Sequence, residues 1–151
     1  MSGAQAPLKV LFDTNVVLDI LMKRAPHAEA AIPLLVLVEQ KKLDGLLGAT
    51  TVTTIHYLAN KSLGSTAARK HLRTLLSLFD VAPITWDILS DALNLNFTDF
   101  EDAVLHEAAR HAGAKGIVTR DLKGFSKSKL RVYSPLELIK TVERQEIPRG
   151  G

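Results

Sequence analysis

The chain has 151 residues, of which 46% are hydrophobic and 23% are charged, and its formal net charge is +3. These values are typical of one globular domain, so we expect residues 1–151 to form a single domain with a core from about residue 8 to about residue 144. The chain contains no cysteine. This excludes a disulfide scaffold, a thiolate nucleophile and a cysteine zinc site.

No membrane or secretory segment is expected from the sequence. The first seven residues are small or polar, and the apolar run after them has only the length of a strand. A signal peptide or a membrane span needs a longer apolar run, so we expect a cytoplasmic protein with no membrane association. The two ends, residues 1–6 and 147–151, are expected to be frayed.

The N-terminal half of the chain alternates short β-prone runs with helical patterns. The run LKVLF predicts the first strand, and Pro33 inside the second helix predicts a kink or a later start. In chain order we expect a strand at 8–12, helices at 15–22 and from 26 to about 40, a strand at 45–49, and helices at 51–61 and 65–79.

The same alternation continues to the end of the chain. Thr85 is predicted to cap one helix and Thr98 or Asp99 the next. We expect a strand at 80–84, helices from 85 to about 93 and from 99 to about 111, a strand at 116–119, a glycine- and lysine-rich loop, a strand at 131–133 and a helix at 135–144. Strands that alternate with helices predict a parallel sheet covered on both faces, which is a three-layer α/β/α domain.

Charge is distributed unevenly along the chain. Residues 74–109 contain seven acids and no Lys or Arg, whereas residues 61–73 and residues 123–131 each contain four Lys or Arg and no acid. One interpretation is an acidic cleft with basic edges, which suits a polyanion bound through a metal ion. The other is ordinary solvated helix faces and a basic loop, and charge alone does not choose between them.

Four aspartates are predicted to meet at one edge of the sheet. Asp13 follows the first strand, and Asp121 lies just past the strand at 116–119. Asp99 and Asp102 begin the helix that leads into that strand, one turn apart on the same face. In a parallel α/β sheet, ligands bind beyond the carboxyl ends of the strands, so all four carboxylates are expected near one cleft.

Clustered carboxylates repel one another, and a bound cation removes that conflict. Aspartate oxygens together with water and a phosphate make the ligand shell that Mg²⁺ or Mn²⁺ prefers. Such an ion can activate water and stabilise charge on a phosphoryl group, so metal-dependent phosphodiester hydrolysis is the reaction that this set of residues predicts.

Other chemistries of parallel α/β folds lack their marks. An aspartyl-phosphate phosphatase needs a second Asp two residues after the first, and Asn15 stands there. There is no acidic pair of the receiver-domain type, no Gly-x-Gly-x-x-Gly, no Walker lysine loop and no nucleophile elbow.

The motifs in their order resemble those of the PIN domain family. They are DTN at residues 13–15, DFEDA at 99–103 and GIVTRD at 116–121, and the resemblance extends from about Val10 to Ile139. It is nearest to a bacterial branch related to the VapC-type toxins. It implies a sheet of about five parallel strands and a Mg²⁺- or Mn²⁺-dependent ribonuclease, with RNA as substrate, a cognate antitoxin as partner and a homodimeric state.

The resemblance also assigns roles to individual residues. Asp13, Asp102 and Asp121 fall on three of the four acidic positions of the family and are the implied catalytic and metal-binding residues. Asn15 and Thr119 match its small polar positions near the metal ion.

The fourth acidic position is where the chain departs from the pattern. It is usually a Glu on the helix after the second strand, but residues 50–60 contain no acid, and His56 stands at that position to within about one residue. His56 is expected to support the site there, by binding the metal ion or by orienting a water, and Asp99, one turn before Asp102, to join the metal ligands. The alternative function is a non-catalytic PIN domain that binds RNA or a protein partner.

Several other residues carry expectations of their own. Arg120, Lys123, Lys127 and Lys129 are predicted to border the cleft and contact RNA, and for Arg120 the alternative is an ion pair with an acid. Asp19 is expected to be a solvated helix residue, with reach into the site as the alternative, and His106 an exposed helix histidine, with the cleft as the alternative. Trp86 is expected in the core or at an interface.

Overall fold

A computed structural model of the chain describes residues 6–146. The expected fraying at the two ends therefore lies, apart from Ala6, outside the described residues.

All five strands are parallel and form one sheet. They are β1 (Leu8–Phe12), β2 (Leu43–Gly48), β3 (Asp80–Ala82), β4 (Gly116–Val118) and β5 (Arg131–Tyr133), in the spatial order β3-β2-β1-β4-β5. In the register of the central strand, Val10 pairs with Gly45 on one side and with Gly116 on the other. The predicted parallel sheet of about five strands is confirmed.

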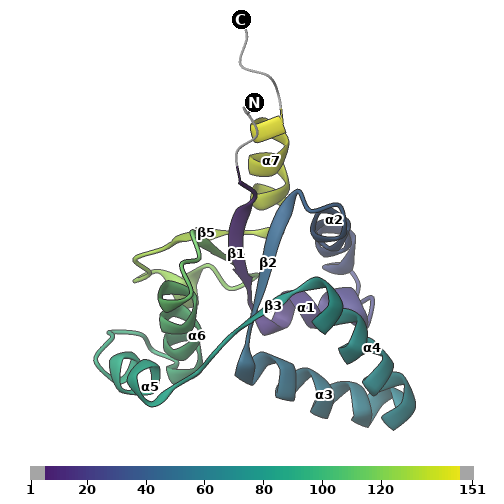
Figure 1. Ribbon diagram of the computed structural model, residues 1–151, viewed down its shortest axis with the longest axis horizontal. Helices are drawn as coiled ribbons and strands as arrows, with labels where there is room; N and C mark the ends of the chain where they lie inside the picture. The colour runs from purple at the N-terminus through teal and green to yellow at the C-terminus, as the bar shows by residue number, and fades with distance from the viewer. Residues whose placement is uncertain (1–5, 147–151) are drawn as a thin grey trace, which may run out of the picture.

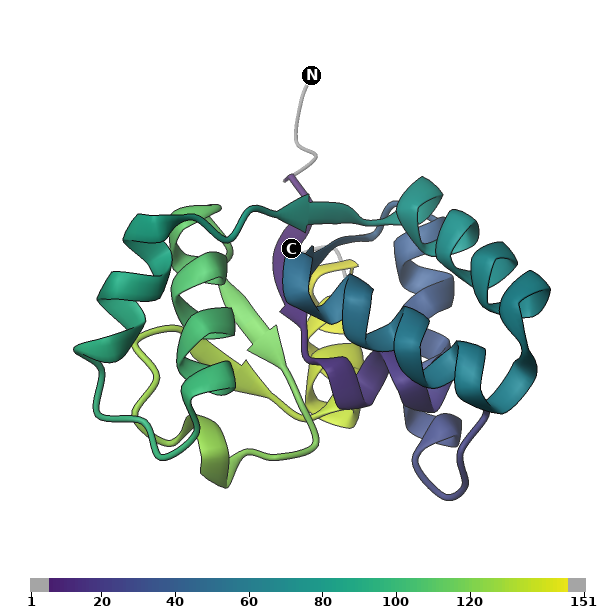
Figure 2. The same ribbon diagram turned by 90° about the horizontal axis from the view of Figure 1, so that it is seen from below.

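Seven α-helices connect and cover the strands within the described residues. They are α1 (Thr14–Leu21), α2 (Ala28–Glu39), α3 (Ala49–Leu63), α4 (Ser65–Leu78), α5 (Trp86–Leu93), α6 (Phe100–His111) and α7 (Pro135–Glu146). Figures 1 and 2 show α5 and α6 on one side of the sheet and α2, α3 and α4 on the other. None of the helices between residues 6 and 146 has the length and apolar character needed to cross a membrane.

The sheet separates two apolar cores, as period-two alternation along each strand requires. In β1, Val10 and Phe12 join the core beneath α1 to α4 and α7, while Leu11 joins the core beneath α5 and α6. Phe12 also packs edge-on against Phe79, with ring centroids 5.1 Å apart. Each such fully buried apolar side chain contributes about 1.5–3 kcal/mol to folding. The three-layer α/β/α prediction is thereby confirmed.

Some element boundaries differ from the predicted ones. Strand β2 begins two residues early, because its pairing with β1 starts at Leu43. Strand β3 stops at Ala82, since Pro83 has no N–H to continue an edge ladder. Helix α2 starts at Ala28 and continues through Pro33, which lies on its exposed face. There the Glu29 carbonyl that loses its helical partner is able to bond water instead.

The connection of the strands reverses direction beside β1. From β1 the chain moves outward to β2 and β3, then returns across the sheet to β4 and β5 on the other side. In open parallel sheets, ligands bind at such a reversal, beyond the carboxyl ends of the two strands that flank it. Those strands are β1 and β4, and they lead directly to Asp13 and Thr119.

Candidate functional site

Asp13 is buried at the end of β1 and held from two directions. Asp13 is only 6% exposed. Oδ1 accepts a hydrogen bond of 2.7 Å from the Thr14 backbone N–H, which caps α1, and Oδ2 accepts one of 2.7 Å from the Thr119 hydroxyl. Burial raises the pKa of Asp13, and repulsion from Asp121 and Asp99 adds to that effect, although the bonds from Thr119 and Thr14 oppose it.

The Thr119 hydroxyl joins the ends of β1 and β4. It donates to Asp13 and accepts from the backbone N–H of Asp121 at 2.9 Å. Asp121 in turn accepts the backbone N–H of Gly124 at 3.0 Å through Oδ1. This chain of bonds determines where the first residues of the β4–β5 loop lie relative to Asp13.

Helix α6 brings two more aspartates to the same edge. Asp99 caps the helix by accepting the Asp102 N–H at 3.2 Å, as the sequence predicts. The helix packs closely on the end of β2, where a β-carbon on Gly48 would lie 2.5 Å from Leu105 Cδ2. Because a real β-carbon does not approach so closely, glycine at position 48 is what allows α6 to lie there.

Asp102 has a raised pKa, as expected of a carboxyl group that lies among other carboxylates. Burial raises its pKa to about 7, and repulsion from Asp13, Asp99, Asp121 and Glu101 contributes to the rise. A carboxyl group whose pKa is raised by both effects is poised to change charge near neutral pH or to exchange its proton for a metal ion.

Gly124 lies directly against two of these carboxylates. A β-carbon at this position would be 2.6 Å from Asp121 Oδ2 and 3.0 Å from Asp102 Oδ2. The two oxygens therefore face the same point and are no farther apart than these two distances combined. A side chain at position 124 would occupy the space between them.

The donor set suits a hard divalent cation. The four aspartates lie close enough for the charges of other members to raise the pKa of Asp13 and of Asp102, although no three of them bring ligand atoms within 4.8 Å of one another in the described residues. In residues 6–146 none of the four forms a salt bridge with Lys, Arg or His. A metal ion of the Mg²⁺ or Mn²⁺ type fits oxygen donors of this kind and offsets their repulsion.

A second cluster of ligand-type side chains lies between α5 and α6. Donor atoms of Asp91, Glu107 and His111 lie within 4.8 Å of one another. The Arg110 guanidinium already neutralises this cluster, at 3.0 Å from Glu107 and 3.9 Å from Asp91. We interpret it as an ion-pair network that ties the two helices together.

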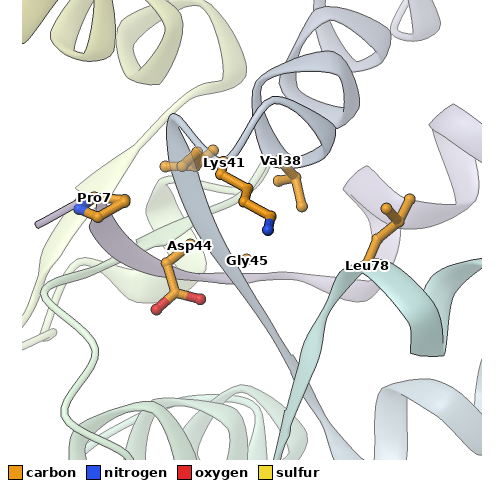
Figure 3. Close-up of a pocket in the computed structure, with 7 residues that line it drawn as sticks. Pro7, Val38, Lys41, Asp44, Gly45 and Leu78 are labelled. Atoms are coloured by element: carbon orange, nitrogen blue, oxygen red, sulfur yellow. The ribbon is translucent and has the colours of Figure 1, made fainter.

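A shallow pocket of about 200 Å³ lies at the opposite edge of the sheet. Figure 3 shows Lys41, Asp44 and Gly45 around it, at the amino end of β2, with Pro7 just before β1. It therefore lies at the amino ends of the strands, away from Asp13.

Comparison with known protein families agrees with this geometry. A family model described as PIN domain matches residues 9–123, which is most of the chain. The chain belongs to the PIN domain family. The match covers β1, β4 and the helix between them that carries Asp99 and Asp102.

Relatives of this PIN domain cover nearly its whole length. Ribonuclease VapC1 of Aquifex aeolicus is 26% identical over 141 residues, which is 89% of this chain and 92% of that protein. A toxin–antitoxin complex from Klebsiella pneumoniae contains a chain with a TM-score of 0.66 and 24% identity, covering 85% of this chain and 98% of that one. PAE2754 of Pyrobaculum aerophilum has a TM-score of 0.62 and 20% identity, covering 94% and 99%.

Of the predicted supporting residues, Asn15 lies beside the aspartates, whereas His56 is not linked to them within residues 6–146. The side chain of Asn15 lies beside the site, where Oδ1 is 3.5 Å from the Arg120 N–H, at the limit of a hydrogen bond. His56 is half-buried on α3, and no hydrogen bond or ion pair joins its side chain to another residue of the described chain. The nearest α3 link to the site is instead Thr51, whose hydroxyl lies 2.8 Å from that of Thr14.

The expectation of a solvated Asp19 is wrong. Asp19 is fully buried and forms ion pairs with Arg24 at 2.9 Å and Arg120 at 2.6 Å. Arg120 is therefore attached to α1, with its side chain 32% exposed. The local sequence held a signal, because Asp19 stands among Val, Leu and Ile residues on every side of a short helix, which is typical of a buried helix.

His106 is neither exposed nor turned to the cleft, so both expectations for it are wrong. Its side chain is completely buried, and it bonds Glu107 and the backbone of Lys129. Trp86 is 78% exposed and does not belong to the core. The burial of Glu107 was not predicted from the sequence periodicity. Glu107 is buried beside His106, within a run of small apolar residues.

Proposed function

We propose that this PIN domain is a Mg²⁺- or Mn²⁺-dependent endoribonuclease, the toxin of a toxin–antitoxin pair. The observation that carries the proposal is the cluster of Asp13, Asp99, Asp102 and Asp121 at the switch point of the sheet, with no cationic side chain paired to it in residues 6–146. The likeness to Ribonuclease VapC1 supports the same reaction class.

Each side chain has a role that follows from its surroundings. Asp13, Asp102 and Asp121 are proposed to hold the cation, with Asp99 contributing from the helix cap. A bound divalent ion would activate water and stabilise charge on the scissile phosphate. Thr119 links the Asp13 carboxylate to the backbone N–H of Asp121, and Asn15 lines the same edge.

The substrate is proposed to be RNA, held through its phosphates. Lys123, Lys127 and Lys129 are exposed on the loop that follows Asp121, and no acid pairs with them within the described chain. Arg120 lies between this loop and α1, where Asp19 orients it. Residues 45–79, which form most of β2 and all of α3 and α4, contain four Lys or Arg and no acid. Such unpaired positive surface beside a carboxylate site favours a polyanion.

We further propose that the protein is cytoplasmic and that residues 1–151 act as one domain. We also propose that it forms a homodimer and binds an antitoxin. The toxin–antitoxin complex from Klebsiella pneumoniae supports the antitoxin by likeness of fold alone. Exposed Trp86, Leu89 and Leu93 lie along one face of α5 and form an apolar strip that suits a second copy.

The second candidate function is an RNA- or partner-binding module without catalysis. The observation that favours it is the absence of an acid on α3, where His56 makes no contact with the aspartates through a hydrogen bond within the described residues. The two functions differ in one result, because only the enzyme cleaves RNA.

The test is cleavage of several RNA types by purified protein in EDTA, Mg²⁺ and Mn²⁺. Asp13→Asn and Asp102→Asn run alongside, with Asp87→Asn, an exposed acid on α5, as the matched control. We expect metal-dependent cleavage that falls by about 100-fold or more in the first two variants and stays unchanged in the third. No cleavage with either metal would favour the binding module, and cleavage that persists in Asp13→Asn and Asp102→Asn would contradict the assigned site.

A further inference from the structure

The loop between β4 and β5 is anchored at its far end by one buried histidine. The loop begins with Asp121 and Gly124 and carries the three exposed lysines. The backbone N–H of Lys129 donates to His106 Nε2 at 3.0 Å. His106 lies in the middle of α6, and its side chain is completely buried. The helix that presents Asp102 therefore also holds the loop that presents Asp121.

The contacts of His106 define its tautomer. Because Nε2 accepts a hydrogen bond, it carries no hydrogen, and the ring proton lies on Nδ1. Nδ1 lies 2.9 Å from Oε2 of Glu107 and donates to it. Glu107 is itself 3% exposed and accepts the Arg110 guanidinium through both oxygens, at 3.0–3.3 Å.

Burial is the main reason why the His106 ring stays neutral. Burial lowers the pKa of His106, and the positive charges of Arg110 and Lys129 lower it further, while Glu107 acts in the opposite direction. Burial would raise the pKa of Glu107, but its bonds from Arg110 and His106 outweigh burial and hold it below the usual range. A protonated His106 would lose its acceptor atom and release the Lys129 N–H.

Aromatic packing beneath the loop points to the same role. Phe97 lies against the His106 ring with centroids 5.1 Å apart and meets Phe125 edge-on at 6.0 Å. Phe125 belongs to the loop and is almost completely buried. The ring of His106 thus lies at a point where helix α6, the Phe97 segment and the loop meet.

We propose that His106 is a positioning residue that holds the β4–β5 loop against α6, so that the Asp121 carboxylate and Gly124 lie beside Asp102. The catalytic consequence rests on the proposed nuclease function, whereas the anchoring of the loop does not. The acceptor atom of the neutral imidazole carries this role, because a partly buried backbone N–H that loses its hydrogen-bond partner is unfavourable unless water reaches it.

The test compares His106→Gln with His106→Leu. Glutamine can place an oxygen near the position of Nε2, whereas leucine fills space without an acceptor. Loop opening is followed by limited trypsin digestion after Lys123, Lys127 and Lys129, with digestion after Lys61 and Arg69 in the α3–α4 pair as an internal reference. His27→Gln, an exposed histidine just before α2, is the matched control.

We expect His106→Leu to speed digestion within the loop roughly tenfold without changing the reference sites. We expect His106→Gln and His27→Gln to resemble the parent chain, and RNA cleavage to fall in His106→Leu and to recover in His106→Gln. Unchanged loop digestion in His106→Leu would overturn the anchor. Loop opening with undiminished RNA cleavage would overturn its catalytic part, and failure of His106→Gln to restore either property would show that ring volume matters rather than the acceptor.

A measurement on the unaltered chain covers the case in which His106→Leu does not fold. The ¹⁵N–¹H spectrum of the imidazole at neutral pH should show a protonated Nδ1 and a bare Nε2 for His106, with slow exchange of the Lys129 amide. A proton on Nε2, or rapid exchange of that amide, would overturn the proposal even if the protein cleaves no RNA.

Discussion

At the scale of single residues, Asp102 is the group that couples the site to pH. Burial and four neighbouring acids raise its pKa from 3.8 to about 7, so the folded chain holds this proton more tightly than the unfolded chain does. Between about pH 4 and about pH 7 the folded state binds more protons, and stability therefore falls as pH rises through that window.

We predict that, in EDTA, the free energy of unfolding rises as the pH is lowered from about 8 to about 6.5. At about pH 8, Asp102→Asn should be more stable than the parent by about 1–2 kcal/mol, after allowance for solvent screening. Denaturant titrations at several pH values measure this. Below about pH 6.5 the buried neutral His106 acts in the opposite direction, because only the unfolded chain then takes up its proton. A parent and an Asp102→Asn variant with parallel pH profiles would contradict the prediction.

Gly124 allows a second prediction at this scale. In Gly124→Ala the new β-carbon meets carboxylate oxygens of Asp121 and Asp102, so either these carboxylates turn away or the loop moves, and both changes disturb the site. We expect RNA cleavage to fall by about tenfold or more at a cost in stability of only about 1 kcal/mol. Single-turnover cleavage and chemical unfolding measure the two effects. Ser126→Ala, in the same loop and exposed, should change neither, and wild-type cleavage by Gly124→Ala would refute the close packing.

The residues at the site differed in how far sequence could predict them. Asp13, Asp99, Asp102 and Asp121 were predictable, since strand ends and helix caps leave local marks, and the order of the strands then brings those marks together. The contact of Asp19 with Arg120 and that of His106 with the Lys129 backbone were not predictable, because these partners lie far along the chain. Three-residue and four-residue spacing on a helix does not reveal such partners.

At the scale of elements, Asp19 attaches α1 to the β4–β5 loop through Arg120. Removing the single buried carboxylate leaves two guanidinium groups without a partner, whereas removing either arginine leaves the other in place. We expect Asp19→Ala to lower the free energy of unfolding by about 2–3 kcal/mol and Arg24→Ala by about 1 kcal/mol or less, since the arginines reach solvent. Urea unfolding measures both. Equal losses in the two variants would show that Asp19 is not the centre of this contact.

Element types were predictable, while their ends depended on neighbours. The alternation of apolar strands and amphipathic helices was enough to predict a parallel sheet between two helical layers. The start of β2 at Leu43 depends on its pairing with Leu8, which the local sequence does not reveal. The end of β3 depends on Pro83, which the local sequence does show. Helix α2 tolerates Pro33 because the residue lies on the solvent face, which a single sequence does not reveal.

At the scale of the whole molecule, charge is divided between the acidic site and a basic flank. The α3–α4 pair extends from the site edge of β2 and carries Arg69, Lys70 and Arg73 on its exposed surface (Figure 1). We predict that replacing these three by Gln reduces the slope of log K for RNA binding against log salt by about 2. Binding is measured by fluorescence anisotropy in EDTA, where no cleavage competes. Lys140→Gln with Arg144→Gln on α7 is the control, and an unchanged slope in the triple variant would exclude this flank from RNA binding.

Binding of a divalent cation to the aspartate cluster is the central claim, and Mn²⁺ titration by calorimetry tests it most directly. The experiment compares the parent chain with Asp102→Asn and Asp87→Asn near neutral pH. We predict one Mn²⁺ per chain, loss of that binding in Asp102→Asn, retention in Asp87→Asn, and a gain in stability of about 2–3 kcal/mol at ~100-fold excess over Kd. Absence of Mn²⁺ binding by the parent chain, or equal affinity in Asp102→Asn, would contradict the account.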